Sequence, residues 1–221
     1  AYLGLVSQVD YGIGLILQEV QKQGALENTI IVYSADHGDY AGEHGLYEKR
    51  GGISTRAITR IPLIVRYPRK VPRGRVCEEI VESLDIFPTC CELAGIEIPN
   101  HVQGCSVIPL LSETPSAIRD SALTENPYRK ALATKRWRFV ANIDGQEDEL
   151  YDQVGDPWEL SNRIHDADCA PVVQQMQRHL LDRLAHARRP INTINGFWHN
   201  HKYDRDGRID LAASGGRSAY W

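Results

Sequence analysis

The chain has 221 residues, of which 42% are hydrophobic and 24% are charged, an ordinary composition for a globular protein. A net charge of −4 without any basic run argues against nucleic-acid binding. No apolar run reaches the roughly 18 residues that a membrane span needs. The amino-terminal segment has no basic region ahead of its apolar residues, so we do not expect it to be a signal peptide. This length is compatible with one large domain or one and a half.

The first half of the chain predicts helices that alternate with strands. Apolar residues recur at helical spacing over 2–23, and Gly24 follows as a stop signal. The run IIVYSA is typical of a strand inside a parallel sheet, and PLIVRY predicts a second buried strand. A helix is expected over 83–95, and it tolerates Pro88 only if its first turn is kinked or it begins later.

The composition changes after the first half, at the linker-like segment SETPSAIRD. Four short runs, SALTE, KALATK, WRFVANI and DELYD, then predict a small antiparallel sheet. Apolar spacing over 171–188 predicts an amphipathic helix that packs on this sheet. We therefore divide the chain into an α/β part (1–112), an α+β subdomain (113–190) and an irregular tail (191–221).

Ionisable side chains gather directly behind the first predicted strand. Asp36 and His37 follow IIVYSA at the carboxyl end of the strand, where ligands gather in α/β sheets. They offer one oxygen and one nitrogen to a metal, on a tight turn where Gly38 allows backbone angles that other residues resist. Lys49 lies 12 residues after His37, near enough to return its ammonium to the same place. A metal beside a lysine favours a doubly charged tetrahedral anion.

Other interpretations of these and similar residues stay open. Asp36 and His37 could form a plain strand-end turn held by an Asx-type hydrogen bond. His199 and His201 in the tail lack further metal ligands and are more typical of solvent-exposed residues. The nearby run YDRDGRID does not fit a calcium loop, because Lys202 would occupy a position that needs a carboxylate.

The five cysteines lack the spacing of zinc or redox sites, and we expect them to be structural and unpaired. They are Cys77, Cys90, Cys91, Cys105 and Cys169. Cys90 and Cys91 lie in an apolar helical stretch, where small buried thiols are common.

Five segments carry a resemblance to a known family. They are ENTIIVYSADHGDYAGEHGLYEK, RIPLIVRYP, SLDIFPTCCELAGIEIP, QGCSVIPLL and ELYDQVGDPWELSN. In this order they resemble the carboxyl-terminal part of the sulfatases, which belong to the alkaline-phosphatase-like superfamily. The resemblance covers roughly 2–184 and implies an α/β fold. It implies a mixed sheet with flanking helices, followed by a small antiparallel sheet with a packed helix.

The resemblance also implies roles for individual residues. Asp36 would be a carboxylate ligand of a divalent metal, and His37 would be a neighbouring ligand. Lys49 would bind a sulfate oxygen, and His44 in the GEHG turn would contact the substrate or support the site. The family usually uses calcium, although a histidine ligand also suits manganese or zinc. Here GGIST lengthens the loop after Lys49, and Arg56 becomes a candidate anion binder.

The nucleophile of the family is not found in this sequence. Sulfatases carry a cysteine or serine in C/S-x-P-x-R, which matures to formylglycine, whose hydrate attacks sulfur. Cys169 is followed by Ala-Pro but lacks the arginine, and no other cysteine fits better. The paired aspartates that complete the metal site come from an earlier strand, which is also absent. We therefore expect formylglycine on a complementary amino-terminal half, and we expect this chain alone to be inactive and poorly soluble.

The sequence thus predicts a metal-dependent hydrolase of sulfate esters, acting on a small molecule or a sulfated glycan. A phosphonate monoester hydrolase or phosphodiesterase of the same superfamily is a close rival. A non-catalytic remnant that binds a partner subunit through its sheet edge is a rival from another class. Cytoplasmic, periplasmic and secreted locations all stay open, as does a homo-oligomer.

Overall fold

The computed structural model describes residues 2–49, 55–111, 116–143 and 145–187, together with two short strands in the tail. The helices are α1 (Tyr2–Lys22), α2 (Arg56–Thr59), α3 (Ile86–Ala94) and α4 (Ala170–Ala187), with short 3₁₀ segments at η1 (Leu26–Asn28), η2 (Glu43–Gly45), η3 (Ser83–Asp85), η4 (Ile108–Leu111) and η5 (Ala167–Cys169). The strands are β1 (Ile31–Ser34), β2 (Leu63–Arg66), β3 (Ala122–Glu125), β4 (Arg129–Ala133), β5 (Trp137–Asn142), β6 (Glu149–Asp152), β7 (Lys202–Tyr203) and β8 (Ile209–Asp210). The predictions on His199 and His201 lie outside the described residues.

Strands β1 and β2 form a two-stranded sheet, at the positions that the sequence predicts. They run antiparallel, with Ile31 opposite Arg66 and Ser34 opposite Leu63. The expectation that both strands are buried was wrong, because Ile64 on β2 is 59% exposed. The expectation of a parallel sheet for β1 was also wrong, because β1 pairs antiparallel with β2 and no third strand of the described residues pairs with either of them. β-branched residues suit a pleated surface in either orientation, so their run does not distinguish parallel from antiparallel pairing.

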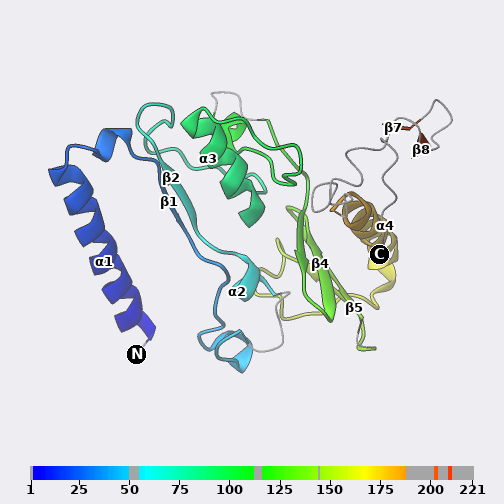
Figure 1. Cartoon of the computed structure of the whole chain (residues 1–221). Coiled ribbons are helices and arrows are strands. Elements are labelled where there is room, and N and C mark those ends of the chain that lie inside the picture. The colour runs from blue at the N-terminus through cyan, green and yellow to red at the C-terminus, as the bar shows by residue number, and fades with distance from the viewer. Residues whose placement is uncertain are drawn as a thin grey trace, which may run out of the picture.

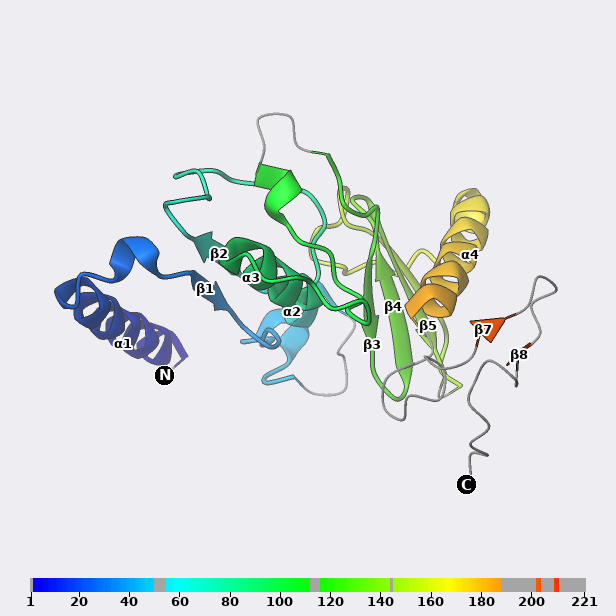
Figure 2. The same ribbon diagram turned by 45° about the horizontal axis from the view of Figure 1, so that its top comes forward.

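The second sheet is antiparallel in the order β3-β4-β5-β6, and α4 packs on one of its faces (Figures 1 and 2). Leu132 pairs with Phe139, which in turn pairs with Leu150, so three apolar side chains from adjacent strands lie in one row. They form a single buried core with Met176 and Leu180, which lie one turn apart on α4. The predicted antiparallel sheet with a packed helix is confirmed.

Helix α1 has the predicted extent but buries none of its residues. Its apolar stripe is open to solvent, with Leu5 60%, Val9 54% and Ile16 66% exposed. In both views the helix lies at one end of the molecule, beyond β1 and β2 (Figures 1 and 2). Neither α1 nor any other helix of the described residues combines the length and the apolar content that a membrane crossing requires.

Helix α3 confirms the expected solution for Pro88. The α-helix begins only at Ile86, after the 3₁₀ turn η3, so that Pro88 falls in its first turn, where its missing N–H costs no hydrogen bond. Gly95 ends the helix in the left-handed conformation (φ 73°), and its N–H donates to the carbonyl of Cys91.

All five cysteines are free, as predicted. Cys91 and Cys169 are buried, whereas Cys77 and Cys105 are exposed. Burial and the neighbouring Cys91 raise the pKa of the Cys90 thiol, which makes it a weaker nucleophile at neutral pH.

Candidate functional site

The Asp36-His37-Gly38 turn lies just beyond the carboxyl end of β1, as the sequence predicts. The carboxylate of Asp36 accepts a hydrogen bond from the backbone N–H of His37 at 3.0 Å. Backbone hydrogen bonds, followed by the charges of His37 and Lys49, lower the pKa of Asp36 below its usual value. Its side chain is 87% exposed. The turn therefore presents an ionised carboxylate to solvent.

The imidazole of His37 is held in a definite orientation. Its Nδ1 lies 2.7 Å from the carbonyl oxygen of Gly38. A carbonyl oxygen only accepts, so in the neutral imidazole this contact places the ring hydrogen on Nδ1 and the lone pair on Nε2. Nε2 lies 3.5 Å from Oδ2 of Asp36. Metal-binding histidines are commonly oriented by a carbonyl in this way, so the two side chains fit as neighbouring donors to one cation.

Two donors do not complete a metal site. In the part of the chain that the structure describes, no three side chains of His, Cys, Asp or Glu come together as metal ligands. A calcium ion takes about six to eight oxygen ligands. Asp36 and His37 therefore fit only as part of a site whose other ligands lie elsewhere, and their role as ligands stays a prediction.

Gly38 is required by close packing against α2. Its N–H donates to the carbonyl of Ile58 at 2.7 Å, and a Cβ on Gly38 would lie 1.9 Å from the carbonyl oxygen of Ala57. Gly38 is not among the residues with positive φ. The reason for this glycine that the sequence suggested, an unusual backbone angle, is therefore wrong, and the backbone of α2 leaves no room for a side chain.

The loop after the turn folds back so that Lys49 approaches the site. Tyr40 is buried, and its N–H donates to the carbonyl of Glu48 at 3.2 Å, which closes the loop. Lys49 is exposed, and its charge contributes to the lowered pKa of Asp36. His44 has a left-handed backbone (φ 53°), and its ring lies edge-on to Tyr40 at 6.0 Å. The roles predicted for Lys49 and His44 stay predictions.

A cleft connects this turn to the carboxyl-terminal sheet. Asp36, His37, Arg56 and Arg138 are among the residues that line it. Arg56 donates one guanidinium hydrogen bond, from Nη1, to the carbonyl of Pro157 at 2.8 Å. Since a guanidinium carries five donors, this contact leaves Arg56 able to bind an anion as well.

Two residues of this region were missed by the sequence reasoning. Glu159 accepts a hydrogen bond from the backbone N–H of Arg56 at 2.8 Å and forms an ion pair with Arg138. Glu159 lies within the segment ELYDQVGDPWELSN, which carries part of the resemblance, and a charged residue between Trp158 and Leu160 was the only available signal. Nothing in the local spacing indicates that it would be buried.

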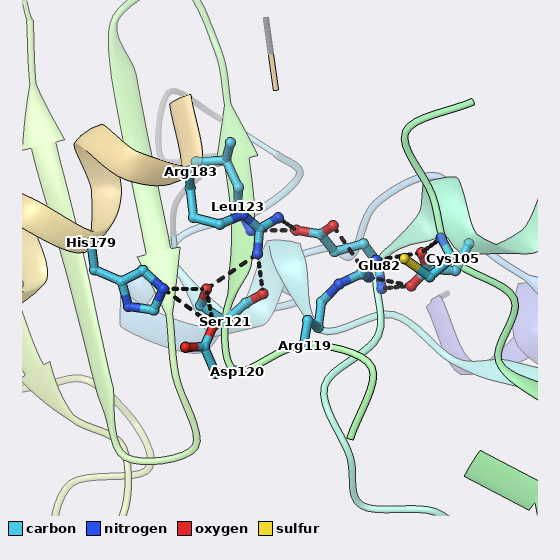
Figure 3. Close-up of polar contacts among 9 residues, drawn as sticks. Glu82, Cys105, Arg119, Asp120, Ser121, Leu123, His179 and Arg183 are labelled. Carbon is cyan, nitrogen blue, oxygen red and sulfur yellow. Dashed lines mark hydrogen bonds and ion pairs between the residues drawn. The ribbon is translucent and has the colours of Figure 1, made fainter. Parts of the chain in front are cut away.

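A second polar cluster combines a serine, a histidine and an aspartate but lacks the geometry of a catalytic triad (Figure 3). Nε2 of His179 faces both Oγ of Ser121 at 3.0 Å and Oδ1 of Asp120 at 3.2 Å. In a triad the aspartate binds Nδ1 instead, and the serine is accessible, whereas Ser121 is 0% exposed. Arg183 donates to the carbonyl of Ser121 and to Glu82, so the cluster joins α4 to the start of β3.

Comparison with known proteins identifies the family. Residues 42–186 match the family model described as N-sulphoglucosamine sulphohydrolase, C-terminal. The N-acetylglucosamine-6-O-sulfatase of Bacteroides thetaiotaomicron is 34% identical over 192 residues, which cover 80% of this chain and 34% of that protein.

Solved structures agree with this assignment. One described as BT4656 in complex with its substrate D-glucosamine-2-N,6-O-disulfate matches with a TM-score of 0.76 and 30% identity, over 86% of this chain and 41% of that chain. A phosphonate monoester hydrolase from Silicibacter pomeroyi matches with a TM-score of 0.78 and 27% identity, and the match covers 94% of this chain and 44% of that chain.

The chain spans 34% and 39% of the length of two curated sulfatase relatives. The matched model describes a carboxyl-terminal region, and the neighbours share the alkaline-phosphatase-like fold that the sequence predicts. The chain therefore belongs to the sulfatase family and corresponds to the carboxyl-terminal part of its members.

Proposed function

We propose that this chain contributes a metal- and anion-binding segment to the active site of an enzyme that hydrolyses sulfate esters. The observation that carries this proposal is the Asp36-His37 turn. It pairs an ionised, exposed carboxylate with an imidazole whose Nε2 lone pair lies beside it. The positive charge of Lys49 acts on the same carboxylate.

The side chains of this segment divide the work as follows. Asp36 and His37 would hold a divalent cation, most simply calcium, with manganese or zinc as alternatives that suit the imidazole. A bound cation of this kind supplies Lewis-acid polarisation of an ester oxygen. Lys49 would neutralise a non-bridging oxygen of the anionic group, and Arg56 offers further donors from the same cleft. The formylglycine nucleophile would come from the complementary amino-terminal half.

The substrate class that we propose is a sulfate ester on a glycan or a smaller sugar. Two comparisons support it, because a curated relative is named an N-acetylglucosamine-6-O-sulfatase and a solved structure is described in complex with a disulfated glucosamine. The exposed apolar stripe of α1, with Leu5, Val9 and Ile16, supports a complementary polypeptide that covers this helix.

A phosphonate monoester hydrolase is the second candidate. The Silicibacter pomeroyi enzyme aligns over 94% of this chain. Phosphonate monoesters and sulfate esters both present a tetrahedral anionic centre, so the same cation and lysine would serve either reaction.

The test is to purify the protein from its native cells through a carboxyl-terminal affinity tag and to measure the intact mass of every associated polypeptide. We expect a longer or a second polypeptide that carries C/S-x-P-x-R.

The preparation should hydrolyse aryl sulfate at least tenfold faster than aryl phosphonate or phosphodiester, and an Asp36→Asn variant prepared in parallel should lose this activity. A preference for aryl phosphonate would instead establish the second candidate. Absence of turnover on all three substrates in the metal-supplemented assembly would leave the non-catalytic alternative.

A further inference from the structure

A buried ion pair joins Arg138 of β5 to Glu159, which also contacts α2 beside the Asp36-His37-Gly38 turn, hereafter called the metal-binding turn after its proposed role. Nε of Arg138, on β5, contacts Oε1 of Glu159 at 2.5 Å, and the two side chains are 5% and 1% exposed. Glu159 also has a left-handed backbone, with φ 56°, which costs energy for a residue other than glycine. A buried charge with an unfavourable backbone persists only where the surrounding structure holds it in place.

The second carboxylate oxygen of Glu159 reaches α2. Oε2 accepts the backbone N–H of Arg56 at 2.8 Å, across 103 positions of the chain. Thr55, which precedes the helix, donates its hydroxyl to the Tyr40 hydroxyl at 3.1 Å and does not cap α2. Glu159 therefore provides an acceptor for one of the backbone N–H groups at the start of this helix, which have no partner within the helix.

Helix α2 in turn contacts the metal-binding turn through its backbone. Ile58 is 1% exposed, and its carbonyl accepts the N–H of Gly38 at 2.7 Å. Because a Cβ on Gly38 would lie 1.9 Å from the carbonyl oxygen of Ala57, the two backbones are already in contact. A shift of α2 is therefore transmitted directly to the turn that carries His37.

We propose that Glu159, held by Arg138, is a positioning residue for the metal-binding turn. Its two carboxylate oxygens connect β5 to the start of α2. Helix α2 in turn fixes the backbone of Gly38, and so it fixes the positions of the metal-ligating atoms of Asp36 and His37. This proposal rests on the proposed function in one respect, namely that the turn binds a cation. That Glu159 orders the turn does not depend on the cation.

Two variants test this proposal with the whole protein. Glu159→Gln keeps the volume but leaves a single acceptor oxygen for two donors, so that either the contact to Arg138 or the contact to Arg56 is lost. The double variant Arg138→Met/Glu159→Leu removes both charges and leaves no unpaired buried ion. The matched control is Arg136→Gln, which breaks the pair (3.0 Å) between Arg136, in the turn before β5, and Asp152 on β6.

Amide hydrogen exchange at Gly38 and titration with Mn²⁺ are the two measurements. In both Glu159 variants we expect the Gly38 amide to exchange at least about tenfold faster and the Kd for Mn²⁺ to rise about tenfold, as for other groups that support metal ligands. The control should match the wild type in both. The proposal would be overturned if the Gly38 amide of both variants exchanged at the wild-type rate. It would also be overturned if the Kd for Mn²⁺ of both variants equalled that of the wild type.

The outcomes also separate this proposal from the proposed function. If the wild type does not bind Mn²⁺ at millimolar concentration, the metal role of Asp36 and His37 is wrong, and the exchange rate of Gly38 still decides whether Glu159 orders the turn. If the wild type binds Mn²⁺ and both Glu159 variants bind it equally well, the positioning role alone is wrong.

Discussion

Replacing Gly38 with alanine should weaken the proposed metal binding at the Asp36-His37 turn by about 10- to 100-fold, as for other changes that remove the support of a metal ligand. The added Cβ would lie 1.9 Å from the carbonyl oxygen of Ala57 and 3.2 Å from Cα of Ile58. Both are backbone atoms, so they cannot rotate away as a flexible side chain would. The turn or α2 must move, and the hydrogen bond from Gly38 to Ile58 must lengthen or break. Calorimetric titration of Gly38→Ala with Mn²⁺ measures the change in Kd.

The matched control is Gly14→Ala. Gly14 lies within α1, and an added Cβ would meet nothing within 4 Å. Alanine is favoured over glycine inside a helix by roughly 0.5–1 kcal/mol, so this variant should be at least as stable as the wild type and should bind Mn²⁺ with the same Kd. A Gly38→Ala protein whose Kd lies within twofold of this control would show that the turn tolerates a side chain.

The second large effect is expected at Asp85, whose replacement by alanine should lower the free energy of unfolding by about 3–5 kcal/mol. Asp85 is 0% exposed. Its carboxylate accepts hydrogen bonds from Nη1 and Nη2 of Arg119 and from the backbone N–H groups of Cys105 and Glu82. Burial alone would lower the pKa of Arg119, but Asp85 and Glu82 more than offset it, and the pKa is raised. Removing Asp85 leaves the backbone N–H groups of Glu82 and Cys105 without this acceptor, and it leaves the buried guanidinium of Arg119 with Glu82 as its remaining carboxylate partner. Figure 3 shows Arg119 beside Glu82 and Cys105.

Urea denaturation followed by circular dichroism measures this loss. Glu27→Ala is the control, since it breaks the Arg66–Glu27 pair (2.8 Å), whose side chains are 35% and 62% exposed. A surface pair of this kind contributes about 1 kcal/mol or less. If Asp85→Ala were no more destabilising than Glu27→Ala, Asp85 would not hold this region together.

Local patterns in the sequence were sufficient to predict most elements of the fold. Met176 and Leu180 are four residues apart, and this spacing placed them on one face of α4, where they pack on the sheet. The position of Asp36 and His37 beyond β1 followed from the strand pattern that precedes them. Each of these features depends on residues that are close together in the sequence.

Features that depend on distant contacts could not be predicted. The partner of Glu159 at the start of α2 lies 103 positions away, and neither residue belongs to a periodic pattern that would reveal the contact. The need for Gly38 arises from the approach of Ala57, so the sequence suggested the correct residue for the wrong reason. The pairing direction of β1 and β2 was also undetermined, because the same β-branched runs fit both orientations.

Whether Asp36 and His37 together hold a cation is tested by an anomalous difference map from crystals of the whole protein soaked in Mn²⁺. We expect a peak about 2.0–2.6 Å from a carboxylate oxygen of Asp36 and from Nε2 of His37. The ammonium of Lys49 should lie on the same side of the turn. A map in which the two side chains point away from each other, with the only Mn²⁺ peaks elsewhere, would contradict it.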